Sequence, residues 1–245
     1  MKRISQLAIS FVCLSILAFN AAAQTDSRSN LIKTIQERRA ELALLEKQVL
    51  EPSEQDKMAH AEFLRQSDTG LVRLLPREKY DDNAYKEKTK PSVTIRGGGA
   101  YYSFTMLSHD YNSGAPQISL ENKKLSVGFA GANYGILTTL GNVSLEEITI
   151  DHPSVQFMAN YEPPNEETSA RLEARRFVNG VSIGEARYTR SEPAKVDTTY
   201  LLRSISFISA DVLVALRIVR QDTDGSMIIA WKLLKKYPTP TFAQK

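Results

Sequence analysis

Apolar residues between Ser29 and Leu50 recur at steps of three or four positions, and neither Gly nor Pro interrupts them. This spacing places one apolar stripe along a helix. The stripe consists of Leu31, Ile35, Leu42, Leu45 and Val49. We expect an amphipathic helix whose stripe packs on its own domain or, in the alternative, associates with a second copy of the chain.

A second helix is predicted from Ser53 to about Gln66, because Pro52 ends the first helix and Ser53 can cap the amides that follow. Gly70 suits the exit of this helix. The short apolar run Leu71–Leu75 fits a buried strand and a docking segment equally well. We assign residues 24–75 to a helical N-terminal segment.

The stretch 76–91 is mostly charged, with both signs present, and has almost nothing apolar to bury. It predicts a solvated linker. After Pro91 the chain changes to short runs of β-branched and aromatic residues separated by turn-forming residues, which is typical of strands. The predicted strands are Ser92–Arg96, Ala100–Ser108, Gln117–Leu120, Leu125–Phe129, Tyr134–Leu140, Glu147–Ile150 and Val155–Tyr161.

Three dense apolar runs near the end of the chain predict an antiparallel meander: Thr199–Phe207, Asp211–Arg220 and Ser226–Leu234. The middle run is apolar on both faces, so we expect it to be central. In the last run Met227, Ile229, Trp231 and Leu233 share one strand face, so we expect Trp231 to be buried. One exposed helix is expected from Ala170 to Phe177.

These elements predict an α+β fold, with N-terminal amphipathic helices followed by a mainly antiparallel β-sandwich or barrel-like domain over residues 92–237. Residues 238–245 form a tail. The 245 residues are 42% hydrophobic and 24% charged, which excludes collagen-like, disordered and multi-span membrane proteins.

The first 23 residues have the layout of a secretory signal peptide: Lys2 and Arg3, an apolar run, and small residues at 21–23. The apolar run is shorter than the roughly 20 residues that a membrane-spanning helix needs. We expect cleavage after Ala23, no transmembrane span in the mature chain, and a periplasmic or secreted protein.

Cleavage would lower the formal net charge from +3 to +1 and remove Cys13, the only cysteine. A nearly neutral chain is not typical of a nucleic-acid-binding protein. A chain without cysteine has no disulfides, zinc–cysteine sites or cysteine nucleophiles.

Three short motifs resemble functional signatures but lack their context. Gly180–Gly184 matches the G-x-S-x-G nucleophile elbow, yet all three histidines precede Ser182. The tripeptide Asp68-Thr69-Gly70 does not follow the apolar strand that an aspartic protease requires. Asp222–Gly225 resembles a calcium loop, but Arg and Trp occupy its first and last ligand positions. We predict no catalytic, metal-binding or cofactor-binding residues.

Aromatic residues gather in the glycine-rich middle of the β half. Tyrosine rings can stack on sugars or bind peptides, because they combine an apolar face with a polar tip. The candidate binding residues are Tyr101, Tyr102, Tyr111, Tyr134 and His109. A hydrolase site around His109 and His152 is the alternative.

The sequence therefore predicts an exported, non-enzymatic binding or interaction protein whose ligand is an unidentified protein or saccharide. Two alternatives stay open. One is the hydrolase, and the other is an envelope structural component that forms a homo-oligomer through the first helix.

Overall fold

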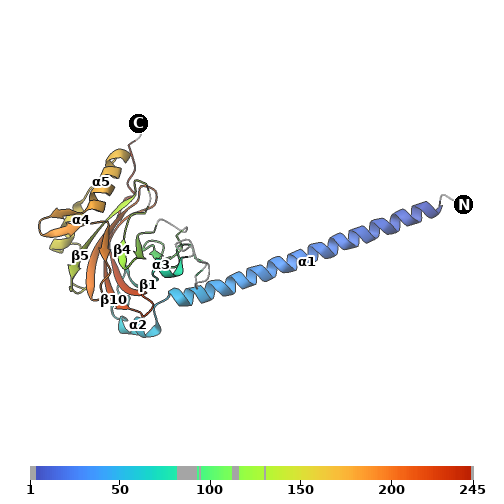
Figure 1. Cartoon of the computed structure of the whole chain (residues 1–245), viewed down its shortest axis with the longest axis horizontal. Helices are drawn as coiled ribbons and strands as arrows, with labels where there is room; N and C mark the ends of the chain where they lie inside the picture. Colours follow the sequence, from blue (N-terminus) through green and yellow to red (C-terminus); the bar gives the residue numbers. More distant parts are fainter. Residues whose placement is uncertain (1–3, 82–92, 94, 112–115, 130, 244–245) are drawn as a thin grey trace. The chain divides into compact units, whose positions relative to one another are not determined.

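The computed structural model describes residues 4–81, 93, 95–111, 116–129 and 131–243, and the side chains of the first helix from residue 27 onward. The chain divides into two compact units, Met1–Val49 and Leu50–Lys245. Helix α1 (Ile4–Leu50) makes up the described part of the first unit (Figure 1), and only its last residue, Leu50, is counted in the second unit. The predicted helix over 29–50 is thus confirmed as a helix, and it begins earlier. Among the described residues, no helix has the length and apolar character needed to cross a membrane.

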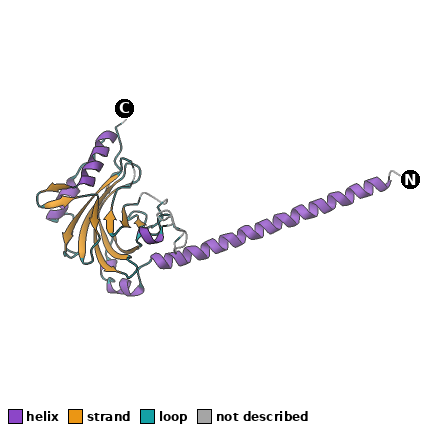
Figure 2. Ribbon diagram, viewed as in Figure 1, coloured by secondary structure: helices purple, strands orange, loops and turns teal. Residues whose placement is uncertain are grey.

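The second unit is built mainly from antiparallel sheets (Figure 2). The largest sheet has the strand order β1 (Thr69–Leu74), β11 (Met227–Tyr237), β10 (Asp211–Gln221), β9 (Thr198–Ile205) and β5 (Tyr134–Gly141). A four-stranded sheet has the order β2 (Tyr101–Tyr102), β3 (Ile118–Glu121), β4 (Lys124–Ser126) and β8 (Ser191–Pro193). A hairpin pairs β6 (Val181–Ile183) with β7 (Ala186–Tyr188).

The predicted C-terminal meander is present as β9, β10 and β11, with β10 at the centre. Alternate residues of β10 enter two different apolar clusters: Val214 and Leu216 enter one, and Leu213 and Ala215 enter the other. The five-stranded sheet is therefore buried on both faces, as the apolar pattern of the middle run predicts.

The first apolar cluster lies between the two larger sheets. Ile118 and Leu120 of β3 and Leu125 of β4 pack in it with residues of β10 and β11. Trp231 of β11 belongs to the same cluster and is only 4% exposed. This cluster gives the four-stranded sheet one buried face and leaves its other face for a different use.

Two helices cover the opposite face of the five-stranded sheet (Figure 1). Met158 of α4 (Gln156–Asn160) and Phe177 of α5 (Glu167–Asn179) pack in the second cluster with Leu213 of β10. The exposed helix predicted over 170–177 is therefore confirmed as α5, although Ala170 and Phe177 are buried.

The strand predicted over 155–161 is wrong, because this segment is helical. Pro153 begins a 3₁₀ helix, η3 (Pro153–Val155), and the side chain of His152 accepts a hydrogen bond from the Ser154 amide at its start. The buried residues Val155, Met158 and Ala159 follow at helical spacing into α4. The run predicted as a strand over 147–150 forms turns.

The segment before the sheets also differs from the prediction. Ser53 caps a helix as expected, but that helix, α2 (Glu54–Ala59), is short and is followed by η1 (Phe63–Arg65). Gly70 lies inside β1 and not at a helix exit, so the run 71–75 is largely a strand. A Cβ atom on Gly70 would lie 2.4 Å from Cζ2 of Trp231, so only glycine lets the indole pack across this position.

Two other predicted segments differ in part from the structure. The charged stretch 76–91 contains α3 (Arg77–Tyr80), and residues 82–92 lie outside the described residues. The long strand predicted over 100–108 reduces to β2, because the side chain of Gln117 binds the amides of Phe104 and Thr105 where a neighbouring strand would otherwise pair. In the described part of the chain neither larger sheet closes on itself, so the barrel alternative is not observed.

Candidate functional site

The four-stranded sheet places a row of hydroxyl-bearing residues on the face that points away from the first cluster. The strand registers align Tyr101 with Ser119, Ser119 with Ser126, and Ser126 with Ser191. Successive residues of a strand point to opposite faces, so the apolar neighbours of these residues enter the core. The Ser126 hydroxyl donates to the Ser191 hydroxyl over 2.9 Å.

A cleft of about 660 Å³ lies over this row. One phenol and three serines of the row line it, and cationic, aromatic and hydroxyl side chains complete the lining. The cationic residues are Arg77, Lys124, Arg187 and Arg190, against one acidic residue, Glu121. A second cavity of about 470 Å³ shares Arg77, Tyr101 and Tyr111 with the cleft and adds Arg96 and Asp81. Arg77, Tyr101 and Tyr111 thus line both cavities, and we refer to the two together as the groove.

Tyr101 is the centre of an aromatic group in this groove. Its ring centroid lies 5.0 Å from that of Tyr111 and 5.4 Å from that of Phe129, both edge to face. Burial raises the pKa of Tyr101, so its phenol remains a hydrogen-bond donor at neutral pH. The Arg77 guanidinium lies 5.8 Å from the Tyr101 centroid, and that of Arg96 lies 5.3 Å from the Tyr111 centroid. Both are within the range of a cation–π contact.

The cations of the cleft differ in their partners. Arg77 is committed to two carboxylates: its Nε lies 3.0 Å from Asp81 Oδ2, and its Nη1 lies 3.2 Å from Glu121 Oε1. Arg190 donates from Nε to the Val127 carbonyl over 3.2 Å. Within the described part of the chain, neither Arg187 nor Lys124 forms an ion pair.

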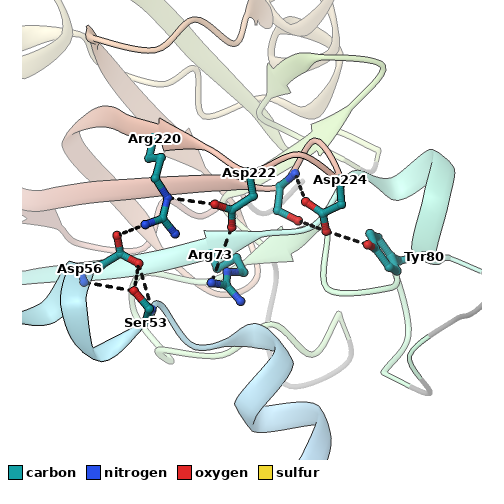
Figure 3. A network of polar contacts seen from close by, with 8 residues as sticks. Ser53, Asp56, Arg73, Tyr80, Arg220, Asp222 and Asp224 are labelled. Carbon is teal, nitrogen blue, oxygen red and sulfur yellow. Dashed lines mark hydrogen bonds and ion pairs between the residues drawn. The ribbon is translucent and has the colours of Figure 1, made fainter.

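A network of polar contacts binds Tyr80, the last residue of α3 (Figure 3), and α3 also carries Arg77. The Tyr80 hydroxyl donates to Asp224 Oδ2 over 2.6 Å, and the Ser226 amide and hydroxyl bind the same carboxylate. Burial, followed by the hydrogen bond to Asp224, raises the pKa of Tyr80 to about 12. Since Asp224 lies in the β10–β11 turn, this turn anchors the helix that carries Arg77.

The other half of the network joins α2 to the same turn (Figure 3). Arg220 lies 2.5 Å from Asp56 Oδ1 and 2.9 Å from Asp222 Oδ1, and Asp222 also pairs with Arg73 at 3.6 Å. Although burial opposes it, hydrogen bonds from Ser53 and the charge of Arg220 keep the pKa of Asp56 low. The carboxylates of the calcium-like motif are thus bound to Arg, Tyr and Ser side chains. Among the described residues, no group of three or more His, Cys, Asp or Glu side chains is placed to hold a metal.

The five candidate binding residues separate into three sets. Tyr101 and Tyr111 line the cleft, as does Phe129, which the sequence analysis did not select. Tyr102 belongs to the first cluster, and His109 packs on it with ring centroids 5.0 Å apart. Tyr102 and His109 therefore support the core behind the cleft.

Tyr134 is buried in the second cluster. Its hydroxyl lies 2.8 Å from that of Tyr161, which donates to Glu173 Oε2 over 2.9 Å. It also lines a cavity of about 130 Å³ that shares Phe129 and Arg190 with the cleft. The ring is 2% exposed, so it contributes to packing more than to a binding surface.

The two histidines of the hydrolase alternative have separate surroundings. His109 Nε2 donates to the Arg73 carbonyl over 2.7 Å and packs against the first cluster. His152 caps the start of η3, whose Val155 enters the second cluster on the opposite face of the five-stranded sheet. No described contact joins the two side chains.

Sequence reasoning missed the basic residues of the cleft. Arg77, Lys124 and the pair Arg187 and Arg190 come from three segments far apart in the chain, and only the fold brings them together. The G-x-S-x-G motif holds a partial signal. Its first glycine, with φ 84°, ends α5, and its last lies in the turn of the β6–β7 hairpin that presents Arg187.

Comparison with protein-family models, curated proteins and solved structures gives no match for this chain.

Proposed function

We propose that the protein is an exported, non-enzymatic binding protein that takes a saccharide in the cleft of the four-stranded sheet. The observation that carries the proposal is the cleft lining, in which aromatic rings around Tyr101 adjoin the serine row and several arginines. Rings offer flat apolar faces for sugar rings, and the hydroxyl and guanidinium groups can bind sugar hydroxyls. We further propose that the two larger sheets act as a sandwich whose shared core keeps this surface rigid.

The carboxylates of the groove favour binding over hydrolysis. Glycoside hydrolysis normally uses a carboxylic acid together with a second carboxylate. Within the described part of the groove, Glu121 and Asp81 both bind the Arg77 guanidinium. Both carboxylates are thus engaged with one guanidinium, which does not suit a pair that must act on opposite sides of a glycosidic bond.

Binding is tested with a panel of immobilised polysaccharides and the variant Tyr111→Ala. Tyr111 is half-buried at the cleft, so its removal should weaken saccharide binding by about tenfold through lost ring contact while the fold persists. Phe242→Ala is the matched control, because Phe242 stacks on Phe207 away from the cleft. Equal affinities of both variants and the wild type would place the ligand elsewhere.

Export rests on the layout of the first 23 residues. N-terminal sequencing of protein recovered from the periplasm or medium should find a mature end at or near Gln24. Intact Met1 on protein recovered from the cytoplasm would reject this part of the proposal.

Self-association through α1 is a second candidate function, favoured by the exposure of the stripe. Leu31, Ile35, Leu42, Leu45 and Val49 are 41–61% exposed. Replacing Leu42 and Leu45 by Asp should convert an oligomer into a monomer without changing the melting temperature of the β unit. Size-exclusion chromatography and thermal melting measure both quantities. A wild-type monomer, or an unchanged oligomer in the variant, would reject self-association through this stripe.

A further inference from the structure

The charges of the cleft are unbalanced in a specific way. Among the described residues, its lining holds four cations and one carboxylate, and that carboxylate is paired with Arg77. The remaining cations are Lys124, Arg187 and Arg190. In the described part of the chain none of these three has a carboxylate partner, although the chain as a whole is close to neutral. Local positive charge in a concave surface attracts and concentrates anions.

The Arg187 guanidinium lies next to Gly180, the residue that caps the C-terminal end of α5. A Cβ atom on Gly180 would lie 2.7 Å from Arg187 Nη2 and 2.9 Å from its Nε, so the guanidinium packs directly on the glycine backbone. Such a close approach is available only because Gly180 has no side chain. The end of α5 therefore lies against the guanidinium that the β6–β7 hairpin carries into the cleft.

Arg190 and Lys124 are two further cations in the lining of the cleft. Arg190 Nε donates to the Val127 carbonyl, and among the described residues its terminal nitrogens have no hydrogen-bond partner and can face a ligand. Lys124 is exposed and lies next to the serine row, two residues before Ser126 on β4. Guanidinium forks bind carboxylate and sulfate oxygens in pairs, whereas neutral sugars offer only single hydroxyl contacts.

We propose that the ligand is an acidic saccharide, that is, a chain of sugar rings bearing carboxylate or sulfate groups. Arg187, Arg190 and Lys124 bind its anionic groups while the rings lie on the aromatic and serine surface. This inference rests on the proposed saccharide-binding function and specifies its substrate class. The aromatic group distinguishes such a ligand from a free inorganic anion, which would use the cations alone.

The test uses calorimetric titration of the full mature chain with matched oligosaccharides. Tetragalacturonate supplies carboxylates, and its fully methyl-esterified form keeps the same rings without charge. A chondroitin sulfate tetrasaccharide supplies sulfate groups, and inorganic sulfate supplies the anion without rings. At least one of the two acidic oligosaccharides, the one whose anionic group matches the natural ligand, should bind at least about tenfold tighter than the neutral ester. Its affinity should fall as the salt concentration increases.

Variants assign the effect to the named cations. Arg187→Ala and Lys124→Ala should each lower acidic-saccharide affinity by about tenfold and leave affinity for the ester unchanged, and Arg187→Lys should restore part of it. Arg65→Ala and Lys236→Ala are controls, because both residues are exposed and lie outside the cleft. Equal binding of the acid and the ester would overturn the charge inference and leave the saccharide function standing. Binding of sulfate alone would overturn the inference as well, and binding of no saccharide would overturn both.

Discussion

The five-stranded and four-stranded sheets share one apolar cluster but differ on their other faces. The five-stranded sheet is covered there by α4 and α5, and its central strand is buried on both sides. The four-stranded sheet presents the serine row and the cleft on its other face. The two sheets therefore differ in character: the larger one is buried on both faces, and the smaller one packs on the shared core and holds a polar cleft on its other face.

The comparison predicts that aromatic truncations will have very different costs in the two sheets. Trp231→Ala should lower the free energy of unfolding by about 3–5 kcal/mol, because the indole is buried against Gly70 and Phe104. Tyr111→Ala in the cleft should cost much less, since its ring is only half-buried. Urea unfolding followed by far-ultraviolet circular dichroism measures both. Similar losses of unfolding free energy in the two variants would contradict this difference between the two sheets.

A buried ion pair in the larger sheet offers a second test. Arg203 and Asp211 are 1% and 2% exposed and form two hydrogen bonds of 2.9 and 2.8 Å. Asp211→Ala should destabilise the protein by about 3–5 kcal/mol, because the guanidinium would remain buried without its counter-charge. Arg171→Ala, which removes an exposed pair with Glu167, should cost less than about 1 kcal/mol. A small loss for Asp211→Ala would mean that this region opens to water.

Gly180 connects stability with binding and should show an intermediate effect. Gly180→Ala should cost about 1–3 kcal/mol because of its positive φ, and it should also displace Arg187 and weaken acidic-saccharide binding. Gly184→Ala is the matched control: its φ is 60°, but a Cβ there would meet nothing within 4 Å. Denaturation measures the cost of the backbone strain, and titration with the acidic saccharide measures the effect of displacing Arg187. Equal affinities of the two variants would remove Gly180 from the binding site.

The smallest expected effect concerns His109, at the edge where the two sheets meet. Burial lowers the pKa of His109 below its ordinary value of 6.5, so the unfolded chain binds this proton more readily than the folded chain. Stability should therefore be complete above about pH 6.5 and should decrease as the pH falls below it. His109→Gln keeps a donor for the Arg73 carbonyl and should flatten this dependence between pH 7 and pH 5. An unchanged slope would show that other groups control it.

The parts of the fold that were predicted correctly are those with a strong local pattern. The three C-terminal strands, the central position of β10 and helix α5 follow from apolar spacing within single segments. The errors arose where side chains override that pattern. Pro153 and the His152 cap turned an apolar run into a helix, and Gln117 bound the amides of a run predicted to be a strand.

For the site, the sequence by itself determined that aromatic residues of the glycine-rich middle were candidates, and Tyr101 and Tyr111 do line the cleft. Only the tertiary structure decided that Tyr102 faces the core while its neighbour Tyr101 faces the cleft, because strand register assigns alternate residues to opposite faces. Likewise, only the tertiary structure brought Arg77 and Lys124 to the segment that contains Arg187 and Arg190. Charged residues far apart in the chain carry no periodic signal, and their proximity depends on the long-range pairing of strands and on the packing of α5 beside them.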